Sequence, residues 1–163
     1  MARMAAFSRS ALLLVAALGL GGRAIGGEEA AADVELKAVV VAASGRSEKP
    51  EFDAKIPADL KDQIKKVNLA YGKYELVEIQ EKGGTFGSDV VIPLPNKESL
   101  VIKPTVDETS TRRARLVYRL LDRDGKVMVV STMRVAYGRS FLIHRAKGSS
   151  GLLMGVSANK PKP

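Results

Sequence analysis

Short runs of alternating apolar and polar residues, separated by turn residues, dominate this chain from Tyr71 onward. The turn signals recur every 8–14 residues and include Gly83-Gly84 and Asp124-Gly125. Apolar residues at every second position are typical of strands that bury one face. The pattern therefore excludes an all-helical fold and predicts a β-rich domain.

The predicted strands span residues 34–41, 73–81, 89–94, 99–106, 113–121, 126–137, 141–145 and 152–157. Leu100, Ile102 and Val106 are expected to point inward from one of them. The apolar phase changes between Leu76 and Val77, which predicts a β-bulge or a strand buried on both faces. Residues 43–55 are polar, contain Gly and Pro, and are predicted to form a loop.

One segment has the spacing of an amphipathic helix. After Ile56, Pro57 opens a stretch in which Leu60, Ile64 and Val67 recur every three or four residues, with charged residues between them. The whole pattern predicts an α+β, β-rich fold: a mostly antiparallel sheet or β-sandwich of about seven strands with one helix.

The N-terminus has the layout of a secretory signal peptide over residues 1–27. Arg3 and Arg9 precede an uncharged apolar run over residues 11–20, which is too short for a membrane-spanning helix. We expect cleavage between Ala24 and Gly27; a mitochondrial presequence is the alternative. The remaining chain is predicted to form one globular domain over residues 28–158 and a disordered basic tail over residues 159–163, secreted or periplasmic.

The composition restricts the chemistry that the chain can perform. Its 163 residues include no Cys and one His, which excludes disulfides, thiolate zinc sites and cysteine nucleophiles. No EF-hand spacing occurs, so we expect neither a metal nor a cofactor. His144 lies in a short apolar strand without a nearby nucleophile or carboxylate in the sequence, and is predicted to be structural.

Positive charge is concentrated in the C-terminal part of the chain. Residues 28–100 hold 10 basic and 14 acidic residues, a net of −4, whereas residues 101–163 hold 13 basic and 4 acidic residues, a net of +9. Aromatic residues make up 5% of the chain and no nucleic-acid-binding motif occurs, so nucleic acid is not an expected partner.

The strongest hairpin signal, Asp124-Gly125, lies within this basic region. A two-residue turn there would place Arg123 opposite Lys126, Arg119 opposite Val130, and Arg115 opposite Arg134. The predicted basic face consists of Arg113, Arg115, Arg119 and Arg134. Like charges facing each other on a sheet are unfavourable, so this face would favour an acidic protein surface, an anionic lipid headgroup or a polyanion.

The same face could instead be an ordinary solvated surface. In that case the arginine stems would shield the sheet, and Asp107, Glu108 or Asp122 would compensate the charge.

The sequence thus predicts an exported, non-enzymatic binding or structural domain of the cell envelope, which docks on an anionic or acidic partner through the basic hairpin face. Exposed strand edges would also allow addition of a partner strand. The alternative is a carrier of a small ligand or lipid, with an apolar pocket between the helix and the sheet. An enzyme whose carboxylates meet only in the fold is a third possibility. The sequence leaves the partner, the envelope type and the oligomeric state open.

Overall fold

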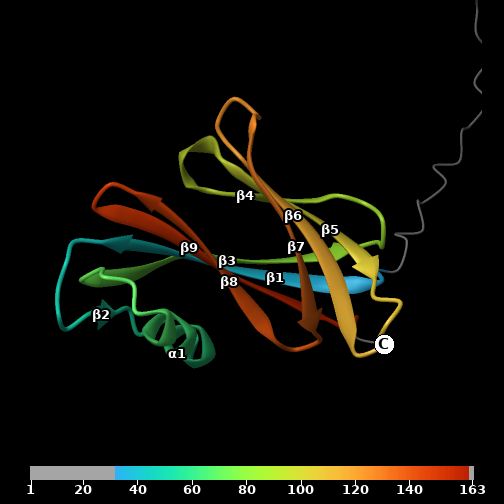
Figure 1. The fold of residues 1–163 in the computed structure, drawn as a ribbon, viewed down its shortest axis with the longest axis horizontal. Helices are drawn as coiled ribbons and strands as arrows, with labels where there is room; N and C mark the ends of the chain where they lie inside the picture. The colour runs from blue at the N-terminus through green and yellow to red at the C-terminus, as the bar shows by residue number, and fades with distance from the viewer. Residues whose placement is uncertain (1–31, 162–163) are drawn as a thin grey trace, which may run out of the picture. The chain divides into compact units, whose positions relative to one another are not determined.

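The computed structural model describes residues 32–161, in which the chain forms nine strands, one α-helix and a short 3₁₀ turn (Figure 1). The predicted signal peptide and the last two residues of the predicted tail lie outside the described residues. The elements are β1 (Val34–Ser44), β2 (Glu51–Phe52), α1 (Ala58–Val67), β3 (Lys73–Gly84), β4 (Val90–Pro93), η1 (Pro95–Lys97), β5 (Ser99–Val106), β6 (Arg113–Leu121), β7 (Val127–Ala136), β8 (Ser140–Lys147) and β9 (Ser150–Asn159).

The strands form two sheets. The five-stranded sheet has the order β2-β3-β1-β9-β8, and the four-stranded sheet has the order β4-β5-β6-β7. All pairs are antiparallel except the short β2–β3 pair. The predicted β-rich α+β fold is confirmed, and the two sheets face each other across a shared core, as in a sandwich.

Strand β1 is buried on both faces because alternate side chains enter two different cores. Val34, Leu36, Ala38 and Val40 join the core between the sheets, whereas Val39, Val41 and Ala43 join the core beneath the helix. The domain therefore has three layers: the four-stranded sheet, the five-stranded sheet and α1, which lies at the lower left of Figure 1.

Helix α1 begins after Pro57 and ends at Asn68, whose backbone is left-handed with φ 52°. Its apolar face packs on the five-stranded sheet through Leu60 and Ile64, both buried. The expectation that Val67 shares this face is wrong: its side chain is 54% exposed, because the helix ends there and the chain turns away. No helix within residues 32–161 has the length and apolarity needed to cross a membrane.

The change of apolar phase in β3 is a β-bulge. Val40 pairs with Glu78 and Val41 with Leu76, so Val77 is the extra residue on β3. The bulge turns Tyr74 into the helix-side core and leaves Val77 exposed. One of the two predicted explanations is thereby confirmed.

The β6–β7 hairpin has the predicted register along its arms but a different turn. Arg119 faces Val130 and Arg115 faces Arg134, as expected. The expected pair of Arg123 with Lys126 is wrong. The backbone N–H of Asp122 donates to the carbonyl of Lys126, so the loop holds the three residues 123–125. A bulge at Met128 then shifts the register back by one residue, so the two offsets cancel.

The structure also differs from three smaller expectations. Part of the predicted loop at residues 43–55 forms β2, which pairs in parallel with the start of β3. Val106 is 60% exposed because the inward positions of β5 end at Pro104, two residues earlier. Strand β9 runs to Asn159, the first residue of the segment predicted as a tail.

We expect Leu60→Ala to lower the free energy of unfolding by about 2–5 kcal/mol, because it opens a cavity between α1 and the sheet. The matched control is Val67→Ala on the same helix, which should change stability by less than about 0.5 kcal/mol because Val67 is exposed. Urea unfolding followed by circular dichroism measures both. Equal losses in the two variants would show that α1 does not dock through Leu60.

Candidate functional site

The four arginines of the predicted basic face lie on the outer side of the four-stranded sheet. Arg113, Arg115 and Arg119 alternate along β6 with side chains that fill the core, among them Leu116. The two-residue period of the strand therefore forces the arginines outward. Arg134 on β7 lies directly opposite Arg115, so the two arginines are cross-strand neighbours on this face.

Asp89 compensates one of these arginines. It lies just before β4, and its Oδ2 accepts a hydrogen bond from Nη2 of Arg119. Its Oδ1 also lies 4.0 Å from Nζ of Lys103 on β5. Local sequence patterns do not indicate this contact, because Asp89 stands 30 residues before Arg119 and reaches it only through the β4–β5–β6 pairing.

Asp107 is the second carboxylate near the basic face and is almost fully buried at the end of β5. Its Oδ1 accepts hydrogen bonds from the backbone N–H and the hydroxyl of Thr109 and lies 4.0 Å from Nε of Arg134. These hydrogen bonds, with the charges of Arg134 and Arg113, hold the pKa of Asp107 below its ordinary value. Within the described residues, the buried Oδ2 accepts no hydrogen bond.

Arg113 and Arg115 are not compensated in this way. Neither forms an ion pair with a carboxylate of residues 32–161, although Arg113 acts on Asp107 through its charge. Of the other expected compensating groups, Asp122 accepts backbone hydrogen bonds in the β6–β7 turn, and Glu108 has no ion pair in the same range. Internal carboxylates therefore balance the basic face only in part.

Aliphatic side chains flank Arg119 on the same face. Val101, Arg119 and Val130 are neighbours across β5, β6 and β7, and Val130 is 60% exposed. Val91 on β4 continues this row and is also exposed. A surface that combines arginine with exposed apolar side chains resembles the composition of protein interfaces more than that of a purely solvated face.

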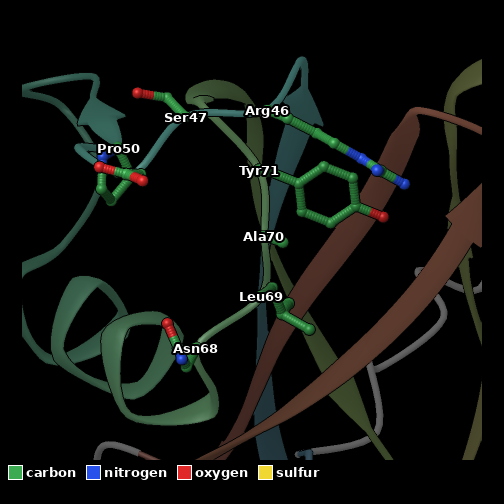
Figure 2. Close-up of a pocket in the computed structure, with 8 residues that line it drawn as sticks. Arg46, Ser47, Pro50, Asn68, Leu69, Ala70 and Tyr71 are labelled. Atoms are coloured by element: carbon green, nitrogen blue, oxygen red, sulfur yellow. The ribbon is translucent and has the colours of Figure 1, made fainter.

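A separate hollow of about 480 Å³ opens where loops meet at one end of the five-stranded sheet (Figure 2). Its walls include Arg46, Asn68 and Tyr71, and Figure 2 shows Arg46 and Tyr71 extending in the same direction, away from the end of α1. The Tyr71 hydroxyl lies 3.0 Å from Nε2 of His144 and donates to the carbonyl of Ser150.

His144 thus contacts a tyrosine that lies 73 residues earlier in the chain. Partial burial beside this ring lowers the pKa of His144 below its ordinary value. Gly151 leaves room for the contact, since a Cβ at this position would lie 2.5 Å from the Tyr71 hydroxyl. Across residues 32–161, no group of three or more His, Asp or Glu side chains could hold a metal ion.

The alternative function, a carrier of a small ligand or lipid, requires an apolar pocket between α1 and the sheet. Leu60 and Ile64 of the helix fill it against Val39 and Leu153 of the sheet. The packing is close: a Cβ at Gly155 would lie 2.7 Å from Cδ1 of Leu60. The hollow beside this contact has a volume of about 240 Å³, and half of its ten lining residues are polar or charged, so it does not form a continuous apolar wall.

Comparison of the chain with family models, curated proteins and solved structures finds no match.

We expect Asp107→Asn to remove a pH-dependent part of the stability, while its amide oxygen can still accept from Thr109. Because the pKa of Asp107 is lower in the folded state, its carboxylate stabilises the fold above the ordinary value of 3.8, and this contribution is lost as the pH falls through the folded-state pKa. The variant should be less stable than the parent at about pH 6, and the difference in stability should become smaller at about pH 2.

Urea unfolding of both proteins at the two pH values measures this difference. Asp124→Asn is the control, because the Asp124 side chain is 76% exposed and should contribute little at either pH. The same pH dependence in both variants would contradict a specific role for the charge of Asp107.

Proposed function

We propose that this protein is an exported, non-enzymatic binding or structural domain of the cell envelope that docks on an acidic partner protein through the basic face. That face comprises Arg113, Arg115, Arg119 and Arg134. Export is inferred from the N-terminal sequence alone. Docking is inferred from the charge and the apolar surface of the four-stranded sheet.

One observation carries the docking proposal: Arg115 faces Arg134 on an uncovered sheet surface, and no carboxylate of residues 32–161 forms an ion pair with Arg115. Like charges directly opposite each other destabilise a sheet. An acidic group of a partner placed between the two guanidinium groups would relieve this repulsion and could form paired hydrogen bonds with them.

The neighbouring valines favour a protein over a free anion as the partner. Val91 and Val130 are exposed in the same cross-strand row as Arg119, and burying them would add a hydrophobic contribution that a small anion cannot supply. The combined surface would give an association that is steered by charge and held by apolar contact.

The test compares two variants of equal net charge. In the first, Arg113, Arg115, Arg119 and Arg134 are changed to Gln; in the second, the exposed Lys49, Lys66, Lys97 and Lys147 are changed to Gln. The full-length proteins are crosslinked in their native envelope, and the recovered partner is identified. Its affinity for each purified variant is then measured at several salt concentrations.

We expect the arginine variant to bind the partner at least about tenfold more weakly and with a smaller salt dependence. The lysine variant should bind like the parent, since its missing charges lie off the basic face. Equal affinities of the parent and the arginine variant would overturn the docking proposal.

A further inference from the structure

Strand β7 forms an edge of the four-stranded sheet and pairs on one side only. β6 occupies that side, and no strand of residues 32–161 pairs with the other. The ten-residue strand therefore presents a row of unpaired backbone N–H and C=O groups. Such an edge is a template for an additional strand unless the protein protects it.

The other sheet edges are short or protected. β2 has two residues and pairs only with Lys73 and Tyr74 of β3; the rest of that β3 edge carries the charged residues Glu75, Glu78, Glu81 and Lys82. β4 has four residues and ends in Pro93, which has no N–H to donate. β8 carries His144, Arg145 and Lys147, and Gln63 of α1 bonds to Ser140 at its start. β7 carries one charge, Arg134, and the bulge at Met128 near its start; the rest of its length has none of these protections.

Exposed apolar side chains are also concentrated on β7. It holds half of the ten large hydrophobic side chains that are exposed within residues 32–161. These five residues are Val127, Met128, Val129, Val130 and Met133. Apolar exposure on this scale along one edge marks an interaction site.

The two faces of β7 differ in chemistry. Val129 and Met133 lie on the core side, opposite Leu120 and Leu116 of β6, yet both are exposed, unlike those two partners. On the outer side, Arg134 lies next to Arg115. An added strand would therefore meet apolar side chains on one face and positive charge on the other.

We propose that β7 binds an extended segment of the acidic partner as an additional strand of the four-stranded sheet. The segment has an acidic residue opposite Arg134 and apolar residues opposite Val129 and Met133. Main-chain hydrogen bonds hold the segment, and the alternating side chains select it. This inference rests on the proposed function, because it describes how the acidic partner meets the basic face.

Charge favours such a segment over a second copy of this chain. Pairing of β7 with β7 of another copy would place two sets of Arg115 and Arg134 on one continuous sheet face. Strand β7 contains no acidic residue that could compensate them. An acidic segment instead brings negative charge to the same face.

The test uses three capped peptides as probes for full-length protein. The first alternates valine and glutamate over the length of β7; the second is identical except for a central proline; the third has lysine in place of glutamate. Dissociation constants come from fluorescence anisotropy, and amide hydrogen exchange followed by NMR reports which backbone groups become protected.

We expect the valine–glutamate peptide to bind and to protect the β7 amides that point away from β6. The proline should weaken binding at least about tenfold, because it removes a main-chain donor and disrupts the added strand. The lysine peptide should not bind detectably.

Two variants of equal charge separate strand addition from simple attraction. Val129→Lys adds a positive charge on the core side of β7, and Val77→Lys adds the same charge on β3; the two valines are 44% and 45% exposed. We expect Val129→Lys to weaken binding at least about fivefold, because a lysine replaces an apolar contact. Val77→Lys should leave the affinity unchanged or slightly raised.

The outcomes distinguish the two proposals. Equal binding of the first two peptides that is lost when the four arginines become Gln would overturn strand addition and leave the docking face in place. Failure of all three peptides to bind at low salt would overturn strand addition, and the partner measurement described above would then decide the docking proposal alone. Sedimentation of the free protein as a dimer that Val129→Lys dissociates would assign the edge to a second copy instead.

Discussion

The burial of β1 on both faces is the constraint on which the rest of this fold depends. Its even-numbered residues from Val34 to Val40 face the four-stranded sheet, and Val39 and Val41 face α1. A strand with two apolar faces must be covered twice, because exposure of either face would leave several large aliphatic side chains in water. The helix and the second sheet supply these two covers, and β3 and β9 supply the hydrogen bonds at its edges.

The same packing determines where the proposed docking surface lies. Since Leu116 and Leu120 of β6 fill the core between the sheets, Arg115 and Arg119 must lie on the opposite face, where no further layer formed by residues 32–161 covers them. Helix α1 packs on the five-stranded sheet, and the four-stranded sheet contributes no residue to the core beneath the helix. The uncovered four-stranded sheet is consequently the part of the described domain where arginines and exposed valines meet.

Much of this arrangement could be predicted from local patterns. The β-rich class, the helix after Pro57, the outward face of β6 and the pairing of Arg115 with Arg134 all follow from periodicity and one strong turn signal. The predicted turn was nevertheless wrong, and the register survived because the bulge at Met128 cancels the longer loop. The bulge at Met128 leaves no change of apolar phase, because residues 127–130 are all apolar, whereas the phase change between Leu76 and Val77 does predict the bulge in β3.

The sequence by itself determined which side chains share a strand face and that the later part of the chain is basic, because both properties are set by neighbours along the chain. Only the tertiary structure decided which charges are compensated. Asp89 reaches Arg119 and Asp107 approaches Arg134 through strand pairing between distant segments, and Tyr71 meets His144 in the same way. Such contacts depend on sheet order, which no local periodicity encodes. The same sheet order left β7 at an open edge.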